Sequence, residues 1–279
     1  MGEAAADICV ASLRVGSSIL VSVALSLTFQ ELVREGRLEP VEGWDFSWLD
    51  ERATEERPSW GYARMIVQRL ASANAALDIQ TGGGEVLAEV LAKVRNHPGT
   101  VAATESWKPN LAVARRLLGP FNATVLECAD DADLPFPDES FDLVISRHPT
   151  VVLWNEIARV LRPSGTYLSQ QIGPGSNREL TDFMMGPQPI SQLRSTERAA
   201  RDAEAAGLDV VDLRQEALRI AFNDVAAVIY FLRKVVWTVP GFTVEGYRDQ
   251  LARLHARIES EGPFIAYSQR FLVEAHKLT

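Results

Sequence analysis

The sequence predicts an α/β protein in which a mostly parallel sheet is covered by helices. Two observations support this fold class. Short apolar runs alternate with stretches of helical period between residues 59 and 175, an order that is typical of βαβ units. The chain also has 279 residues, of which 47% are hydrophobic and 23% charged. These proportions are ordinary for a folded protein that is long enough for one large domain.

The first elements follow from periodicity. Residues 59–71 carry apolar side chains at helical spacing and are predicted to form a helix. Strands and helices then alternate at the spacing of a parallel sheet. The predicted strands are 75–79, 100–105, 123–129, 141–146 and 165–172, and the predicted helices between them are 85–94, 110–118 and 153–161.

Beyond residue 176 the pattern changes to longer elements. An amphipathic helix is predicted over residues 191–208, and Gly207 ends it. Residues 208–222 contain strand material. An apolar helix over 224–237, an amphipathic helix over 243–262 and a closing strand over 270–277 complete the chain.

Residues 7–29 form a conspicuously apolar stretch. The chain begins with MGEAAAD, which is acidic, whereas a signal peptide begins with a basic region. Arg14 also leaves too few unbroken apolar residues for a comfortable membrane span. We therefore expect a docked or mobile N-terminal helix, with a membrane-associated segment or a start codon assigned too far upstream as alternatives. We divide the chain into an N-terminal extension with a possible lid segment, residues 1–58, and a main domain, residues 59–279.

The charged and sulfur-containing residues narrow the class of protein. The formal net charge is −9 and no dense run of Lys and Arg occurs, which argues against a nucleic-acid partner. Cys9 and Cys128 lie far apart, and their scarcity predicts a reducing, cytoplasmic compartment without disulfides. The four histidines form no local ligand cluster, so we predict no metal site.

Three consecutive glycines lie between the predicted strand at 75–79 and the helix that follows. Backbone N–H groups and a helix N-terminus can face a ligand at this position, although a plain structural turn is the alternative. A dinucleotide fingerprint requires G-x-G-x-x-G. Gln80 occupies the first of these positions, and Leu87 stands where the third would be if Gly82 and Gly84 were the first two. A nicotinamide cofactor therefore fits poorly.

The order Asp78, Gly82, Gly84 resembles the first motif of class I S-adenosylmethionine (SAM) dependent methyltransferases, with Gln80 as a departure from it. In that family, the acid at the position of Glu105 accepts hydrogen bonds from both ribose hydroxyls. A carboxylate at the end of a strand suits this task because its two oxygens can accept two O–H donors. A solvated acid in the first turn of a helix is the alternative interpretation of Glu105.

Residues 128–148, CADDADLPFPDESFDLVISRH, are similar to the G-D-A-x-x-L-P-F-x-D-x-x-F-D-L-V pattern of many small-molecule and lipid methyltransferases. On that match Asp130 would accept a hydrogen bond from the adenine amino group, and the backbone of Asp131 would contact a ring nitrogen. The stretch EIARVLRPSGTYLSQQ resembles the family turn that leads into the fifth strand, with Ser164 replacing a glycine.

This resemblance to the class I methyltransferases of the type 11 kind covers roughly residues 60 to 175. It implies a Rossmann-like three-layer sandwich with a mostly parallel seven-stranded sheet and an antiparallel last strand. It also implies S-adenosyl-L-methionine as the cofactor. Asp78 would fix the glycine loop or contact the cofactor's ammonium group. The residues expected to bind the cofactor are Asp78, Gln80, Gly82, Gly84, Glu105, Asp130 and Asp131.

Methyl transfer from a sulfonium is an in-line displacement, so the protein mainly supplies proximity, alignment and exclusion of water. A general base is needed only if the acceptor must lose a proton. His148 follows the strand at 141–146 and is a candidate for base catalysis, for orienting the acceptor, or for a structural role. Arg147 is a candidate to hold an acceptor carboxylate or to pair with a neighbouring acid.

Other residues have two interpretations each. Four aromatic residues before or within the first predicted helix either form a lid over the site or pack in the core, and packing is the commoner role. They are Trp44, Trp48, Trp60 and Tyr62. Five residues of later elements either reach the acceptor or only stabilise the fold, namely Gln170, Gln171, Tyr230, Arg233 and Trp237.

The acidic net charge and the lack of an appended RNA-binding module favour a small-molecule acceptor. An RNA or protein methyltransferase stays open, since the acceptor is selected by loops outside the motifs. The competing class is a non-catalytic methyltransferase-like protein that holds SAM or its product. Gln80 and the long N-terminal extension are the features that favour it.

Overall fold

The structure is a computed structural model that describes residues 27–41 and 46–279. Most of the apolar stretch at 7–29, and Trp44, lie outside the described residues. Within the described part of the chain, no helix is long and apolar enough to cross a membrane.

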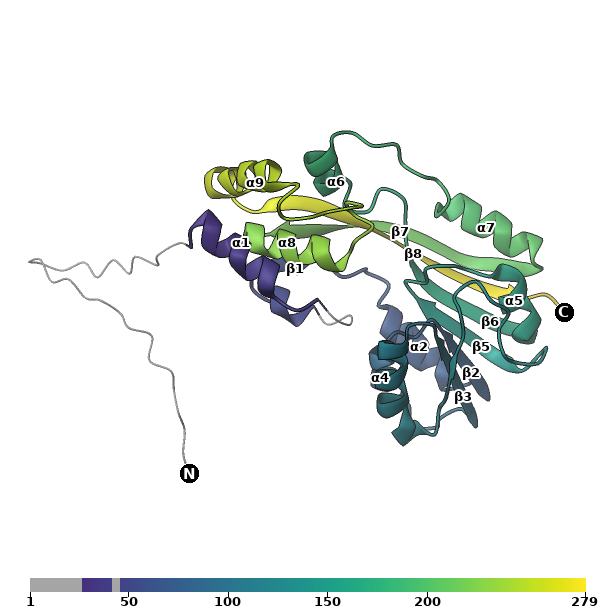
Figure 1. The fold of residues 1–279 in the computed structure, drawn as a ribbon. Helices are drawn as coiled ribbons and strands as arrows, with labels where there is room; N and C mark the ends of the chain where they lie inside the picture. Colours follow the sequence, from purple (N-terminus) through teal and green to yellow (C-terminus); the bar gives the residue numbers. More distant parts are fainter. Residues whose placement is uncertain (1–26, 42–45) are drawn as a thin grey trace, which may run out of the picture.

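One sheet runs through the whole molecule (Figure 1). Its strands are β1 (Ala53–Glu55), β2 (Ala75–Ile79), β3 (Thr100–Glu105), β4 (Thr124–Glu127), β5 (Phe141–Arg147), β6 (Leu161–Ile172), β7 (Leu208–Phe222) and β8 (Phe264–Lys277). Their order in space is β1-β7-β8-β6-β5-β2-β3-β4. β2 to β6 pair in parallel, and the last strand, β8, is antiparallel to both β6 and β7. The predicted mostly parallel sheet with an antiparallel last strand is confirmed.

The predicted number of seven strands is wrong, because β1 adds an eighth at the edge of the sheet. β1 pairs antiparallel with the end of β7, where Ala53 lies opposite Phe222 and Glu55 opposite Ile220. β8 pairs with one edge of β7, so the other edge of β7 has free backbone groups that another strand can satisfy. A strand of three residues is too short to carry a period-2 signal in the sequence.

The helices are α1 (Phe29–Leu38), α2 (Tyr62–Leu70), α3 (Glu85–Leu91), α4 (Lys108–Leu118), α5 (Trp154–Val160), α6 (Arg178–Met185), α7 (Thr196–Ala205), α8 (Val225–Lys234) and α9 (Arg248–Glu261). Two short 3₁₀ turns lie at Ser47–Leu49 and Gly119–Phe121. The helix predicted over 191–208 is wrong at its start, because α7 begins at Thr196. The Ser195 hydroxyl caps α7 by accepting from the backbone N–H of Arg198 at 3.2 Å, as expected of an N-cap serine.

Helices cover both faces of the parallel part of the sheet (Figure 1). On one face, α2, α3 and α4 pack in an apolar cluster around Ile66, Leu91 and Leu118. On the other face, α5 and α7 bury a second cluster that includes Ile157 and Tyr167. This arrangement is the three-layer sandwich that the sequence predicts.

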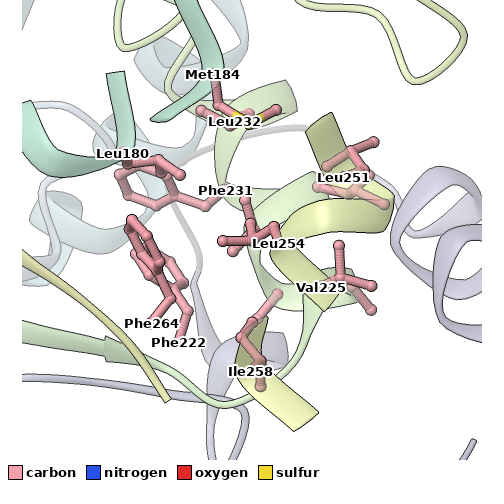
Figure 2. Close-up of a cluster of buried hydrophobic side chains, with 14 of the residues drawn as sticks. Leu180, Met184, Phe222, Val225, Phe231, Leu232, Leu251, Leu254, Ile258 and Phe264 are labelled. Carbon is pink, nitrogen blue, oxygen red and sulfur yellow. The ribbon is translucent and has the colours of Figure 1, made fainter. Parts of the chain in front are cut away.

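A third apolar cluster lies at the far end of the β7–β8 strand pair (Figure 2). β6 ends at Ile172, opposite Arg270, whereas β7 and β8 continue pairing to Phe222 and Phe264. Four helices, α1, α6, α8 and α9, pack around this extended strand pair. We call these helices, with residues 217–222 and 264–269, the helical lobe.

Part of the predicted N-terminal extension belongs to the helical lobe. Gly36 of α1 touches α8 so closely that a Cβ there would lie 2.6 Å from the carbonyl oxygen of Ala226. Arg233 of α8 donates to the carbonyl oxygens of Gly36 and Glu39 at 2.7 and 2.8 Å. The boundary at residue 58 stays a prediction, and residues 29–39 pack against α8 in the described structure.

Candidate functional site

The predicted site residues lie along one edge of the sheet. In a parallel sheet, the carboxyl ends of the strands meet at the same edge, where open α/β proteins bind their ligands. Asp78 lies near the end of β2, Glu105 ends β3 and Arg147 ends β5. The fold therefore places residues from three separate stretches of sequence at one edge.

The glycine loop connects β2 to α3. Gly82 and Gly84 have φ values of +65° and +80°, a left-handed conformation that glycine adopts without a steric penalty. A Cβ on Gly84 would meet the side chain of Leu118 at 3.0 Å, whereas a Cβ on Gly82 would have nothing within 4 Å. Gly84 thus allows close packing, and the backbone at Gly82 faces open space that a ligand can approach.

Gln80 also has a left-handed backbone, with a φ of +56°. Its backbone N–H donates to the Thr104 hydroxyl at 3.3 Å. Its side-chain Nε2 donates to the Val151 carbonyl at 2.8 Å, and its Oε1 accepts from the backbone N–H of Thr150 at 2.6 Å and lies 3.0 Å from the Thr150 hydroxyl. The side chain therefore joins the glycine loop to the segment that follows β5.

Asp78 is a buried carboxylate below the glycine loop. Burial raises the pKa of Asp78 from its ordinary value near 3.8 to about 7, against the hydrogen bond from the Thr81 hydroxyl and the charge of Arg147, which lower it. That hydroxyl donates to Asp78 Oδ2 at 2.6 Å. An approaching cation would favour the ionised form of Asp78.

Glu105 is 6% exposed and lies beside the glycine loop. Its Oε2 accepts from the backbone N–H of Gly82, and its Oε1 accepts from the backbone N–H of Trp107, each at 2.8 Å. Burial raises the pKa of Glu105, and the two backbone hydrogen bonds oppose that rise. Each oxygen keeps a further acceptor site, so the buried carboxylate has the capacity to bind two hydroxyl groups.

Asp130 and Asp131 lie in the loop after β4. The Asp130 carboxylate is half-buried and accepts a hydrogen bond from the Thr150 hydroxyl, while Asp131 is exposed. A cavity of about 20 Å³ separates this loop from the glycine loop and from the segment after β5. Its walls include Ile79, Gln80, Thr104, Asp130, Val151 and Tyr167.

Two arginines and one histidine lie near the ends of β5 and β6: Arg147 and His148 at the end of β5, and Arg270 on β8 opposite Ile172, the last residue of β6. The positive charges of Arg147 and Arg270 both lower the pKa of His148, and Arg147 lowers the pKa of Arg270. Arg270 pairs with Glu55 at 2.8 Å. Arg147 is exposed and, among the residues that the structure describes, has no acidic group at ion-pair distance. We call Arg147, His148 and Arg270 the cation cluster.

His148 is fixed by a chain of hydrogen bonds. Its backbone N–H donates to the carbonyl oxygen of Gln170 at 2.7 Å. Its Nε2 lies 3.0 Å from the side-chain Nε2 of Gln170, and Gln170 Oε1 accepts from the Trp60 indole N–H at 2.9 Å. Burial is the largest cause that lowers the pKa of His148 well below its ordinary value.

The remaining candidates lie elsewhere. Tyr62 donates its hydroxyl to the carbonyl oxygen of Ser146 at 2.6 Å. Trp48 packs on Tyr230 in the helical lobe, with ring centroids 4.8 Å apart, and Trp237 is exposed. Gln171 is buried, and its Nε2 has no hydrogen-bond partner in the described part of the chain.

Sequence reasoning missed Thr150 and Arg270. No family motif covers Arg270, and a single Arg at the start of an apolar strand is a weak signal. Among residues 27–41 and 46–279, no group of three or more His, Cys, Asp or Glu side chains could hold a metal ion.

Residues 77–169 match a family model described as a methyltransferase domain. Among curated proteins, the malonyl-[acyl-carrier protein] O-methyltransferase of Marinomonas sp. (strain MWYL1) is 25% identical over 201 residues, which cover 66% of this chain and 74% of that protein.

Two solved structures illustrate the likeness of the fold. The YcgJ protein from Bacillus subtilis is 18% identical with a TM-score of 0.55, over 78% of this chain and 98% of that one. The Haemonchus contortus phosphoethanolamine N-methyltransferase 2, in complex with phosphomonomethylethanolamine and S-adenosylhomocysteine, is 16% identical with a TM-score of 0.50, over 91% of this chain and 61% of that one. The matched family region begins in β2 and ends in β6, so it contains the glycine loop, Glu105, Asp130 and Arg147.

Proposed function

Because this chain is a class I SAM-dependent methyltransferase whose cofactor is S-adenosyl-L-methionine, we propose that it methylates a small molecule through a carboxylate oxygen of the acceptor. The cation cluster is the observation that carries this proposal. Arg147 and Arg270 lie close enough for their charges to repel, and one acid, Glu55, pairs with Arg270. A cluster with an excess positive charge favours an anion.

The cation cluster is a neighbour of the expected cofactor site. Asp78 is the residue that the family motif places near the ammonium of SAM, and the charge of Arg147 lowers the pKa of Asp78. Arg147 therefore lies within electrostatic range of the amino-acid end of the site. An acceptor carboxylate on Arg147 would sit beside the part of the cofactor that carries the methyl group.

A carboxylate acceptor needs no general base, which agrees with the neutral state of His148 in this site. When bound, the cofactor supplies an electrophilic methyl group. A carboxylate is already ionised at neutral pH, so it can attack that carbon without losing a proton. Arg147 would hold one carboxylate oxygen and orient the other, and His148, whose pKa is low, stays neutral beside it. The O–CH₃ bond forms as the S–CH₃ bond breaks, and no residue has to act as a base.

A cavity next to the cation cluster supports a small acceptor. It measures about 360 Å³ and has Arg270 in its wall, with Gly173, Thr196, Gln215, Gln269 and Phe271. Pockets for small molecules begin at about 300 Å³. The curated relative is named for O-methylation of a malonyl group, which carries a carboxylate, and that name is consistent with the proposal. The chain has two cysteines, and so few fit a reducing compartment, which supports a cytoplasmic location.

The test is methyl transfer from methyl-labelled SAM to a panel of short carboxylic acids, each paired with its primary amide. Free acids, and the same acyl groups on a carrier protein, form separate arms of the panel. We expect labelled product from acids and none from amides, and we expect the label to be released by mild base as from a methyl ester. Transfer to amides, amines or RNA with none to any acid would contradict the proposal. If only carrier-bound acids are methylated, the acceptor is not a small molecule, but methylation of a carboxylate oxygen still holds.

A matched pair of arginine variants tests the role of the cation cluster. Arg147→Met should lower kcat/KM for the acid at least about tenfold, the scale of one lost charged hydrogen bond. Arg253→Met, which removes an exposed arginine from α9, is the control and should leave kcat/KM unchanged. Equal activity of the two variants would remove Arg147 from the acceptor site.

A further inference from the structure

We infer that Trp60 and Gln170 are positioning residues that hold His148 as a neutral hydrogen-bond donor, with its proton on Nδ1 and directed to the acceptor. The tautomer follows from the described geometry alone. Only the identity of the group that receives the hydrogen bond rests on the proposed function. None of the matched motifs contains Trp60.

The Trp60 indole N–H determines which atoms of Gln170 and His148 donate and which accept. An indole N–H can only donate, and it lies 2.9 Å from Gln170 Oε1. This contact assigns the amide oxygen of Gln170 to the side that faces Trp60. The amide NH₂ must then be the group 3.0 Å from His148 Nε2. An NH₂ group has no lone pair that accepts a hydrogen bond, so His148 Nε2 accepts and the ring proton is on Nδ1.

The charges around His148 favour this neutral form. Burial lowers the pKa of the His148 ring, and the positive charges of Arg147 and Arg270 lower it further. The acid Glu55 is paired with Arg270. A positive charge on the ring would therefore be repelled by the charges of two arginines. A protonated Nε2 would also point its hydrogen at the NH₂ group of Gln170.

The hydrogen bonds leave Nδ1 available. Within the described residues Nδ1 makes no hydrogen bond, and it is not among the enclosed side-chain atoms that lack a partner. The same residue, Gln170, also accepts the backbone N–H of His148 at 2.7 Å. Gln170 therefore holds both the backbone and the ring of His148, the ring through Nε2 alone, and Nδ1–H is free to donate. In the carboxylate mechanism, such a donor helps Arg147 to orient the acceptor without moving a proton.

A purely structural role is the alternative. Trp60 and Gln170 are 3% and 4% exposed, and buried polar groups need partners whatever their function. Two readouts separate the roles. The tautomer of His148 shows whether the chain of hydrogen bonds sets the ring. The kinetic constants show whether that setting matters to the acceptor.

The first experiment is ¹⁵N NMR of the full chain with labelled histidine, and His148→Gln assigns the His148 signal. We expect a protonated Nδ1 and an unprotonated Nε2 at pH 7. In Gln170→Glu, the carboxylate accepts from both Trp60 and His148, so the proton moves to Nε2 or the ring becomes charged. Trp60→Phe frees the amide to rotate, which should give a mixture of both tautomers. A protonated Nε2 in the wild-type protein would overturn the inference.

The second experiment measures methyl transfer for the same folded variants, with thermal unfolding as the check on folding. We expect Gln170→Glu to lower kcat at least fivefold with an unchanged KM for SAM. His97→Gln, which changes an exposed histidine between α3 and β3 whose ring lies against Phe121, is the control. A switched tautomer with unchanged kcat would overturn the positioning role. If no acid is methylated but the tautomer is as expected, the proposed function fails and the assignment of the ring proton stands.

Discussion

Gln80 shows how one residue can replace a motif glycine. A non-glycine residue in the left-handed region costs about 1–3 kcal/mol, and Gln80 has a φ of +56°. Its carboxamide offsets this cost through hydrogen bonds to Thr150 and Val151. The glycine loop keeps its turn, and it gains a bridge to the segment after β5 that the family motif lacks.

The Gln80 bridge can be tested by hydrogen exchange. In Gln80→Gly, the backbone N–H of Thr150 loses the Oε1 acceptor at 2.6 Å. We expect its exchange with solvent to speed up about tenfold, the scale of one lost hydrogen bond. The backbone N–H of His148, which donates to Gln170, is the internal control and should keep its rate. If Thr150 exchanges at the same rate in both proteins, Gln80 does not hold the segment.

Asp130 is the residue predicted to accept a hydrogen bond from the adenine amino group of SAM. In the described structure its carboxylate accepts from the Thr150 hydroxyl, and a carboxylate keeps further acceptor sites for a ligand donor. Asp130→Ala should weaken SAM binding by about 1–3 kcal/mol, because a half-buried acceptor is lost. Asp131→Ala is the matched control, since its expected contact uses only the backbone. Calorimetry measures both, and an unchanged affinity of folded Asp130→Ala would remove this residue from the site.

Asp78 makes stability depend on pH. Burial raises its pKa to about 7, so the protonated form is favoured in the folded state. The stabilising effect of protonated Asp78 on the folded state is therefore fully present below about pH 4. The free energy of unfolding falls as the pH rises through about 7, because this effect is lost. Since one pH unit of pKa change corresponds to about 1.4 kcal/mol, the loss is on the order of 4 kcal/mol.

Denaturant unfolding of wild-type protein and Asp78→Asn from pH 4 to pH 8 isolates this effect. Asparagine stays neutral, so the variant should become more stable relative to the wild type as the pH rises. A constant difference across this range would show that Asp78 ionises as freely in the folded state as in the unfolded one.

At the scale of elements, local patterns predicted the strands and helices of the sandwich because each buries a periodic apolar face. The elements that the patterns missed depend on distant partners. β1 forms because it pairs with the outer edge of β7 at residues 220–222, and α7 starts late because the Ser195 hydroxyl caps it at Thr196. The length of the β7–β8 strand pair follows from the helices that pack at its end, which no local period reveals.

The contact between α1 and α8 provides the prediction at this scale. A Cβ at Gly36 would lie 2.6 Å from the Ala226 carbonyl oxygen and 3.0 Å from the Ile229 side chain. Gly36→Ala should therefore destabilise the protein by about 1–3 kcal/mol, as overpacking does, although alanine is the better helix former. Arg34→Ala, on the exposed face of α1, should change stability by less than about 0.5 kcal/mol. Thermal unfolding compares the two, and equal melting temperatures would show that α1 does not pack on α8.

At the scale of the whole molecule, the proposed site has two halves with different origins in the sequence. The proposed cofactor half, from Asp78 to Asp131, follows successive strands, so its motifs are visible in order along the chain. The proposed acceptor half combines Trp60, Arg147, Gln170 and Arg270, which the fold brings together from positions up to 210 residues apart. No local spacing connects them, and Arg270 was therefore not predicted.

The most direct test of this account is calorimetric titration of the purified chain with SAM, S-adenosylhomocysteine and NAD. The geometry of the glycine loop, Glu105 and Asp130 predicts that the first two bind despite Gln80 in the motif, and the incomplete G-x-G-x-x-G pattern predicts that NAD does not. Failure of both SAM and S-adenosylhomocysteine to bind would contradict the account, because Gln80 and Thr150 would then close the cofactor site against its ligand.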